Sequence, residues 1–341
     1  MTTDLFAAAR GLPPDWLSRV VPPACRRDAE PPPSVQPAAG ALCLEFPPWT
    51  PRRPARHLVA SLALPDAPGL TFRFEVAVER AGRWSPWVAT ATIGPGALAP
   101  AGGAATGLEA EIDEWRVQPP AERVRLRVRM RGVTRERLDR GPWLVTLSAS
   151  DLGPAGHAPP PPGPVVLEVP PLSQREAPAE LAPRICSPTS LAMVLAFHGA
   201  AVAPEALAAE VFHPGLDRYG VWPAAIQAAA ARGVLGYLLR FPDWAAAAWC
   251  LAQGLPVIAS LRYRAGALAG APLPEAREGH LVVLRGAEDD HVLVNDPAAP
   301  DRATVVRRYR RVEFCAAWLG GTGVGYVLFR PDARARPGAA S

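Results

Sequence analysis

The sequence predicts two domains of different class, an all-β sandwich followed by an α+β domain. Residues 41–150 contain short segments in which apolar and polar residues alternate, separated by Pro, Gly and Asp. Residues 151–164 are rich in proline, and residues 165–332 place helical patterns before most of the strand patterns. Alternation with a period of two is typical of half-buried strands, and helices followed by an antiparallel run of strands indicate an α+β order. A chain of 341 residues is long enough for about two domains.

The composition is that of a globular protein and excludes several kinds of chemistry. Hydrophobic residues make up 49% of the chain and charged residues 20%. All 36 cationic residues are Arg, and the formal net charge is +4. The absence of Lys excludes a Walker A loop and a Schiff-base mechanism, because both need that side chain. The arginines are interleaved with 32 acidic residues, so we expect no nucleic-acid partner.

The first residues of the chain indicate where the protein is located, and the spacing of its cysteines indicates whether it binds a metal or forms disulfides. The first twenty residues lack a basic start followed by an apolar run of about 7–15 residues, so no signal peptide is indicated. We expect a cytoplasmic protein without a transmembrane segment, and export stays open if translation starts elsewhere. The five Cys show no CxxC spacing, which indicates neither a disulfide scaffold nor a zinc site. No metal is expected.

The first half is predicted to begin with an arm and to end in a linker. Residues 1–40 are rich in Pro and Ala and are predicted to be a poorly ordered arm with one short helix near residues 5–10. The alternation of Arg with Val and Leu at 123–131 indicates a strand with one solvent-exposed face. Residues 151–164 are predicted to be a stiff linker, and residues 333–341 a flexible tail.

The second domain, residues 165–332, is predicted to contain four helices and six strands. Apolar residues at helical spacing and prolines near the helix starts indicate the helices, and short apolar runs indicate the strands. The predicted helices are 188–197, 204–212, 223–232 and 244–252, and the predicted strands are 165–169, 256–262, 280–284, 291–295, 303–309 and 323–330.

Cys186 is the candidate nucleophile because it stands at the predicted start of a helix. Pro188 suits the first turn, where its missing N–H would have no partner. The unpaired N–H groups and the positive end of the helix dipole stabilise an anion there, so the pKa of the thiol should fall below about 8.5. A small buried apolar residue is the alternative, because most free cysteines serve that role.

His280 and Asp296 are the candidate base and the group that orients it. They lie in or next to two apolar strands, 280–284 and 291–295, which a polar loop joins into a predicted hairpin. A three- or five-residue loop would place His280 directly opposite Asp296, with Cβ atoms about 4.5–5.5 Å apart. A four-residue loop would break this pairing unless a bulge restored it. A partly buried strand histidine and a strand-ending turn are the alternatives.

Together these motifs resemble the C39-like group of papain-like cysteine peptidases. The residues that carry the resemblance are Cys-Ser-Pro-Thr-Ser from Cys186, Gly-His-Leu-Val-Val around His280 and Val-Asn-Asp-Pro-Ala around Asp296. The resemblance covers residues 165–330 and implies a papain-like fold in which Cys186 is the nucleophile, His280 the base and Asp296 its orienter. Gln174, twelve residues before Cys186, resembles the Gln that supplies an oxyanion-hole donor in the family. The family chemistry needs no metal or organic cofactor.

Other parts of the resemblance concern the cleft and the first domain. Tyr219 and Trp222 lie in a Tyr-Gly-Val-Trp-Pro segment that is similar to a family element near the cleft, which implies substrate binding, and a turn with a packing Trp is the alternative. The predicted sandwich, with Trp84 and Trp87, is similar to the β-domain ahead of some bacterial C39-like peptidases. These Trp rings could stack on a sugar or a peptide, or pack in the domain. The chain departs from the family at Ser187, where Gly is common.

The sequence therefore predicts a cysteine peptidase that hydrolyses peptide bonds through a Cys-His-Asp triad and a thioacyl-enzyme. Its expected partner is a peptide or protein substrate, with a glycan or protein ligand possible for the β-domain. Two other functions stay open. One is an amidase-like or transglutaminase-like acyl transfer on the same triad, and the other is a non-catalytic glycan- or protein-binding module.

Overall fold

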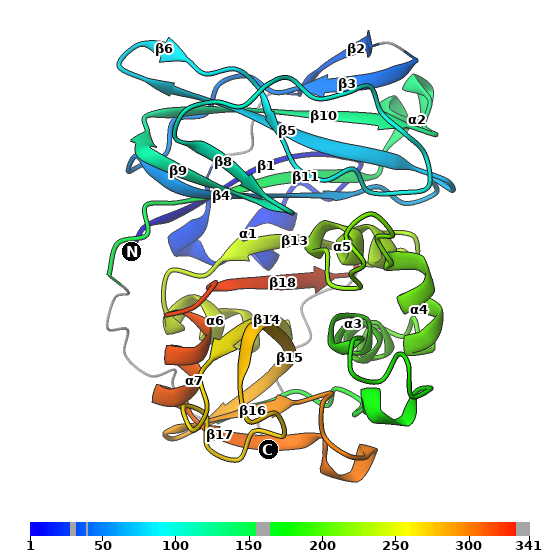
Figure 1. Cartoon of the computed structure of the whole chain (residues 1–341), viewed down its shortest axis with the longest axis vertical. Helices are drawn as coiled ribbons and strands as arrows, with labels where there is room; N and C mark the ends of the chain where they lie inside the picture. The colour runs from blue at the N-terminus through cyan, green and yellow to red at the C-terminus, as the bar shows by residue number, and fades with distance from the viewer. Residues whose placement is uncertain (28–31, 39, 155–163, 332–341) are drawn as a thin grey trace.

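The computed structural model of the chain describes residues 1–27, 32–38, 40–154 and 164–331. Three antiparallel sheets lie in layers, two in the N-terminal half and one in the C-terminal half (Figure 1). Most of the predicted linker and the whole predicted tail lie outside the described residues. Within the described ranges, no helix has the length and apolar character needed to cross a bilayer.

The first sheet lies in the middle of the molecule (Figure 1) and includes a strand that was not predicted. That strand, β1, pairs with β11 along all eight of its residues, and six of them are buried. The predicted helix near residues 5–10 is therefore wrong, because pairing and burial outweigh the helix preference of three consecutive Ala residues. In spatial order the sheet contains β1 (Thr3–Arg10), β11 (Trp143–Ser150), β4 (Ala55–Ala63), β9 (Glu114–Ala121) and β8 (Leu108–Glu111).

The second sheet covers the outer face of the first, and we call the two together the N-terminal double sheet. The alternation in β10 is as predicted, because its Val, Leu and Met side chains are buried and its Arg side chains lie on the other face. In spatial order the sheet contains β2 (Ser34–Ala38), β3 (Ala41–Glu45), β10 (Arg123–Arg131), β5 (Thr71–Arg80) and β6 (Arg83–Trp84), with β7 (Val88–Ala89) also on β5. Short helical segments in this half are α1 (Trp16–Val20), η1 (Pro23–Cys25) and α2 (Arg135–Arg140).

The third sheet and five helices form the C-terminal half. In spatial order the sheet contains β13 (Leu235–Arg240), β18 (Val324–Phe329), β14 (Val257–Tyr263), β15 (Ala276–Glu288), β16 (His291–Asn295) and β17 (Val306–Arg310), with β12 (Val165–Val166) also on β15. The helices are α3 (Cys186–Phe197), α4 (Pro204–Val211), α5 (Trp222–Ala230), α6 (Trp244–Ala252) and α7 (Arg311–Trp318), and the single 3-10 turns are η2 (Gln174–Glu176) and η3 (Arg302–Thr304). The four predicted helices are confirmed, whereas β13 and α7 were not predicted.

The hairpin of β15 and β16 has a shorter turn than predicted. Glu288 pairs with His291, so only Asp289 and one further residue form the turn. Asp289 has a φ of 46°, the left-handed conformation that two-residue hairpin turns require and that Asp tolerates. The polar segment 286–290, which was predicted as a loop, thus mostly extends β15.

Strand β13 is an edge strand whose free side faces the N-terminal double sheet. The backbone N–H groups of Leu238 and Arg240 donate to the hydroxyl oxygens of Ser61 and Ser148, at 3.2 and 3.1 Å respectively. One continuous cluster of buried apolar side chains runs through both halves of the molecule. The double sheet therefore covers an edge that would otherwise be open to pairing with another chain.

Candidate active site

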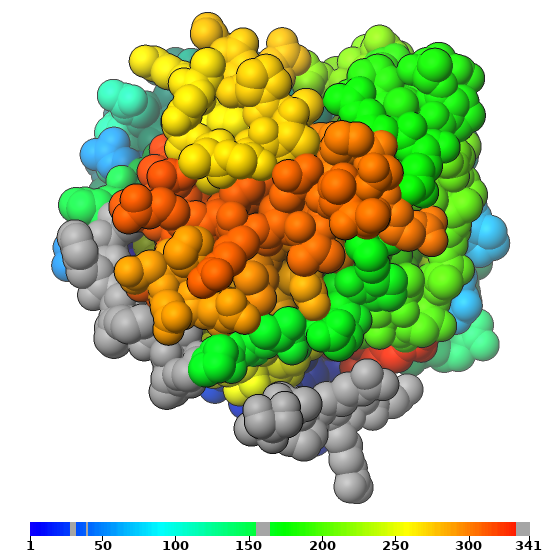
Figure 2. Space-filling model, turned by 90° about the horizontal axis from the view of Figure 1, so that it is seen from below, coloured from blue at the N-terminus to red at the C-terminus, as the bar shows by residue number. Residues whose placement is uncertain are grey.

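Cys186 is the first residue of helix α3 and lines a cleft of about 460 Å³. The residues that follow it in α3, from Ser187 to Leu195, are buried, so the helix is anchored in the core. Residues from four segments line the cleft, 183–186, 216–222, 260–262 and 278–281, whereas His280 is buried and is not itself one of the lining residues. Seen from below (Figure 2), an orange segment of the C-terminal half lies between a yellow segment above it and green segments beside and below it.

His280 and Asp296 form a buried pair, although not in the predicted register. His280 Nε2 and Asp296 Oδ1 are 2.7 Å apart. Because Val283 pairs with Asn295, Asp296 falls opposite position 282 and not opposite His280, so the direct pairing predicted from the loop length is wrong. The offset is two residues, which keeps both side chains on one face, and diagonal neighbours at about 7–8 Å are within reach of a ring.

Cys186 and His280 interact, and each shifts the pKa of the other. Since Nε2 of the ring is bonded to Asp296, Nδ1 is the nitrogen left for the sulfur. Burial would raise the pKa of Cys186, but the hydrogen bond and the charge of His280 bring it below its ordinary value. Burial would also disfavour a charged ring, yet the charge and hydrogen bond of Asp296, together with Cys186, raise the pKa of His280 to about 10. The arrangement favours a thiolate beside an imidazolium at neutral pH.

Tyr309 is a site residue that the sequence reasoning missed. Its hydroxyl donates to Asp296 Oδ2 at 2.8 Å, and the backbone N–H of Ala298 donates to Oδ1 at 3.0 Å. Burial would raise the pKa of Asp296, but the charge and hydrogen bond of His280, the Tyr309 hydroxyl and the Ala298 N–H lower it below its usual range. The available signal was weak: Tyr309 is the only apolar residue between the arginines of residues 307–311.

Gln174 is not brought to the cleft in the way the resemblance implied. It begins the 3-10 turn η2, is buried, and is not among the residues that line the cleft. Its Nε2 donates to the carbonyl of Ala182 at 2.7 Å, and its Oε1 has no partner among the described residues. Its backbone N–H donates to the carbonyl of Pro297, next to Asp296. Its role as an oxyanion donor stays a prediction.

Tyr219 and Trp222 both line the cleft beside Cys186. The ring of Tyr219 packs against Phe212, with centroids 4.7 Å apart, and the guanidinium carbon of Arg184 lies 5.1 Å from its centroid. Trp222 begins helix α5 and is largely buried. The structure thus places both residues where a substrate could reach them.

Ser187 shows how the departure from the family pattern is accommodated. Its side chain is buried, and its hydroxyl oxygen lies 3.5 Å from the hydroxyl oxygen of Tyr326 on β18. The larger side chain therefore packs behind the cleft, away from the surface, and leaves Cys186 as the partly exposed residue.

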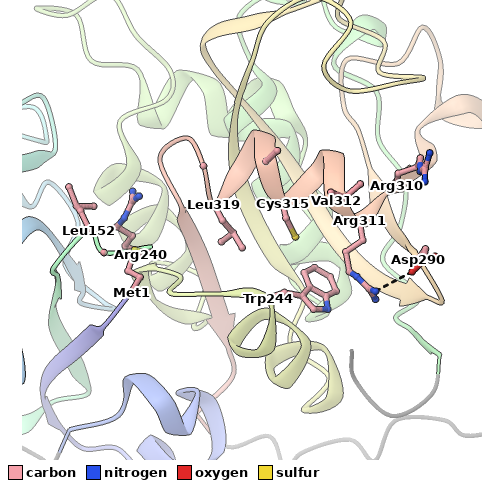
Figure 3. A pocket seen from close by; sticks show the side chains of 13 residues that line it. Met1, Leu152, Arg240, Trp244, Asp290, Arg310, Arg311, Val312, Cys315 and Leu319 are labelled. Atoms are coloured by element: carbon pink, nitrogen blue, oxygen red, sulfur yellow. Dashed lines mark hydrogen bonds and ion pairs between the residues drawn. The ribbon is translucent and has the colours of Figure 1, made fainter. Parts of the chain in front are cut away.

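A second cavity of about 760 Å³ contains another free thiol, Cys315, but lacks the groups that would activate it (Figure 3). Burial raises the pKa of Cys315 to about 11, and the nearby Arg311 offsets this only in part. No His is among the described residues that line this cavity. Burial also raises the pKa of the other three cysteines, so Cys186 alone among the five has a lowered pKa. The described residues contain no His, Cys, Asp and Glu cluster that could hold a metal.

The two Trp residues on the double sheet are partly covered by arginines. The guanidinium carbon of Arg125 lies 4.3 Å from the ring centroid of Trp84 and 5.1 Å from that of Trp87, and that of Arg127 lies 4.2 Å from Trp87. Cation–π contacts of this kind occupy ring faces that a sugar would stack on. The geometry favours the packing alternative for this pair.

Comparisons with known proteins find similarity to peptidases in the C-terminal half. Residues 166–326 match the model of the Peptidase_C39 like family, and no curated protein matches the chain. Similar solved structures include a double glycine motif protease from an AMS/PCAT transporter in complex with its leader peptide, at 19% identity over 49% of this chain and 97% of that chain, with a TM-score of 0.33. The peptidase domain of Streptococcus ComA, a bifunctional ABC transporter involved in quorum sensing, has 17% identity over 43% and 92%, with a TM-score of 0.31. A C39-like peptidase from Bacillus anthracis has 19% identity over 51% and 100%, with a TM-score of 0.39.

Proposed function

Because residues 166–326 match the model of the Peptidase_C39 like family, we propose that the protein is a cysteine peptidase whose nucleophile is Cys186. The observation that carries the proposal is the buried pair of His280 and Asp296, with Nε2 and Oδ1 2.7 Å apart, which lowers the pKa of Cys186 where that residue lines the cleft. A nucleophile, a base and an orienting acid in this order are what acyl transfer to sulfur requires. The nucleophile lies on the first helix of the C-terminal half, and the base and the acid lie on or next to strands of its sheet, which supports a papain-like fold. The two stacked sheets of the N-terminal half support a β-sandwich.

In the first step, the Cys186 thiolate attacks the carbonyl carbon of a peptide bond. A C–S bond forms and the carbonyl electrons move onto oxygen, where they need hydrogen-bond donors. The backbone N–H of Cys186 is one proposed donor, because the first N–H groups of a helix have no partner within it. The resemblance offers Gln174 as the other. Its Nε2 carries a second proton besides the one donated to Ala182, but its buried side chain would have to turn to reach the cleft, which it does not line.

The following steps pass one proton through His280. The imidazolium gives its proton to the leaving amine as the C–N bond breaks, which leaves a thioester on Cys186. The neutral ring then takes a proton from water as that water attacks the thioester. The carboxylic acid is released, the thiolate returns, and the ring is again an imidazolium held by Asp296.

The cleft supports a peptide or protein as the substrate. Its lining combines the aromatic rings of Tyr219 and Trp222 with charged side chains, among them Arg184, Arg218 and Glu278. Aromatic surface with a few polar groups is typical of a binding site for an extended chain.

The proposal is tested by substituting Cys186→Ala and measuring the cleavage of a fluorogenic peptide library. Cys315→Ala is the matched control, because it removes another cavity-lining thiol that lacks a histidine partner. We expect Cys186→Ala to abolish cleavage and Cys315→Ala to leave it unchanged. Mass spectrometry of the products with an added amine distinguishes hydrolysis from acyl transfer. Cleavage retained in Cys186→Ala would overturn the proposal.

A further inference from the structure

Helix α5 begins beside the cleft without a capping side chain of its own. The residue at its N-cap position is Val221, whose side chain offers no hydrogen-bond acceptor. The backbone N–H of Trp222 donates instead to Oδ2 of Asp113, 2.7 Å away. Asp113 belongs to the other half of the molecule, yet its carboxyl accepts an N–H of the first helical turn and lies at the positive end of the helix dipole, as a capping Asp would.

Asp113 is held in place by the N-terminal double sheet. It lies in the turn between β8 and β9 and is buried. The next residue, Glu114, is fixed on both carboxylate oxygens, with Oε2 2.7 Å from Nε2 of His57 and Oε1 2.7 Å from Nη2 of Arg116. The carboxyl of Asp113 therefore acts on α5 from a rigid frame.

The segment that contains Trp222, the donor of this hydrogen bond, forms one wall of the cleft. Residues 219, 220 and 222 line the cleft together with Cys186, whereas Asp113 does not line it and contacts the wall from behind. The charge of Asp113 also reaches Tyr326, whose hydroxyl lies beside that of Ser187. Asp113 is thus placed to affect the wall and not the sulfur.

The carboxyl of Asp113 occupies this place at an energetic cost. Burial is the main cause that raises its pKa, with Glu114 acting in the same direction, and the Trp222 N–H and Arg218 act against them, for a pKa of about 7. An apolar side chain of similar volume would avoid the cost of burying a charge. The hydrogen bond to the start of α5 offsets part of this cost.

We propose that Asp113 is a positioning residue of the cleft, which caps helix α5 from the N-terminal double sheet and thereby fixes the wall against which the substrate binds. The inference rests on the proposed function, because it assumes that a peptide binds beside Cys186. It gives the double sheet a part in substrate binding. In turnover, Asp113→Ala is expected to raise KM and to leave kcat nearly unchanged.

The experiment compares two reagents that modify Cys186 in the full chain. Iodoacetamide is small and needs only the activated sulfur, whereas benzyloxycarbonyl-glycyl-glycyl chloromethyl ketone must also lie along the cleft. The variants are Asp113→Ala, Asp113→Asn, which keeps an acceptor oxygen, and Asp243→Ala as the matched control. Asp243 caps α6, a helix of the same length as α5, through Oδ1 and the N–H of Ala246, and it does not line the cleft.

At pH 8, above the pKa of Asp113, we expect Asp113→Ala to react with the peptidyl reagent about tenfold more slowly, as for one lost hydrogen bond to a charged group, and with iodoacetamide at the wild-type rate. Asp113→Asn should recover most of the peptidyl rate, and Asp243→Ala should change neither. Equal losses with both reagents, or no loss with either, would overturn the inference.

Amide hydrogen exchange at Trp222 provides a readout that does not depend on activity. It should be faster in Asp113→Ala than in wild type and near the wild-type rate in Asp113→Asn; unchanged exchange in Asp113→Ala would overturn the inference. If wild-type Cys186 reacts with both reagents no faster than an ordinary thiol, the proposed function fails, and the exchange rates alone decide whether Asp113 holds the wall.

Discussion

Asp296 is the most heavily bonded side chain of the candidate site. His280 and the backbone N–H of Ala298 donate to one of its oxygens, and Tyr309 donates to the other. A carboxylate with its acceptor sites occupied keeps its negative charge when buried, and that charge is the largest favourable contribution to the protonated form of His280. Tyr309 therefore supports the imidazolium indirectly, by holding the carboxylate that faces it.

Tyr309→Phe should lower kcat/KM by about tenfold, because the loss of a hydrogen bond to a charged group costs roughly 1.5 kcal/mol. The same substitution should lower the pKa of His280, seen as a narrower pH range of Cys186 alkylation. Tyr263→Phe is the matched control. Burial is the main cause that raises the pKa of its hydroxyl and the nearby charge of Asp296 adds to it, but the hydroxyl donates to the carbonyl of Leu273. An equal effect of both substitutions would contradict this role of Tyr309.

At the scale of elements, the hairpin shows what the sequence could and could not predict. The apolar runs predicted both strands and the nearness of His280 to Asp296. They did not predict the two-residue turn. Glu288 is polar and lies in a polar segment, so only its pairing with His291 shows that it belongs to the strand. The register shift between Leu284 and Gly286 left no signal in composition. The contact survives because an offset of two residues preserves the face of each side chain.

Two elements of the C-terminal half were missed for different reasons. All six residues of β13 are buried, so the strand has no alternation to detect. Helix α7 follows β17 directly and begins without a capping side chain, so its start carries no sequence signal. Gln174 was chosen by resemblance alone, and its hydrogen bond to Ala182 is a tertiary contact that no local pattern encodes.

The edge strand β13 supplies a prediction about stability. Replacing both Ser61 and Ser148 by Ala leaves two buried N–H groups of β13 without acceptors, which costs about 1–3 kcal/mol each. We expect a fall of roughly 2–6 kcal/mol in the free energy of unfolding, measured by urea denaturation. Ser34→Ala is the control, because its hydroxyl is exposed. A double variant as stable as the control would show that these hydroxyls do not hold the edge.

At the scale of the whole molecule, the contacts between the two halves lead us to expect that they unfold as one unit. The buried apolar cluster is continuous, Gln227 of α5 bonds to both backbone groups of Leu64, and β13 packs on β4 and β11. Cutting between the halves would expose this surface. The chain length, the change of pattern and the proline-rich linker predicted two domains, but a sequence does not show which surfaces of the two domains pack against each other.

Calorimetry of the full chain should therefore show one unfolding transition, with equal calorimetric and van't Hoff enthalpies. Residues 164–331 expressed alone should lack a cooperative transition, because the contact surface of β13 and α5 becomes exposed. Two separate transitions in the full chain, or a stable C-terminal half, would show that the shared core contributes little.

The central claim is that His280 holds Cys186 as a thiolate, and the pH dependence of Cys186 alkylation tests it most directly. The iodoacetamide rate at Cys186, resolved from the other thiols by peptide mass spectrometry, should form a plateau well below pH 8.5 and change again as His280 loses its proton near pH 10. Cys315, with a pKa raised to about 11, is the internal control and should react slowly throughout. In His280→Ala the plateau should disappear, so that the rate falls about tenfold per pH unit below an ordinary thiol pKa. A wild-type profile with a single midpoint near 8.5, unchanged in His280→Ala, would contradict the account.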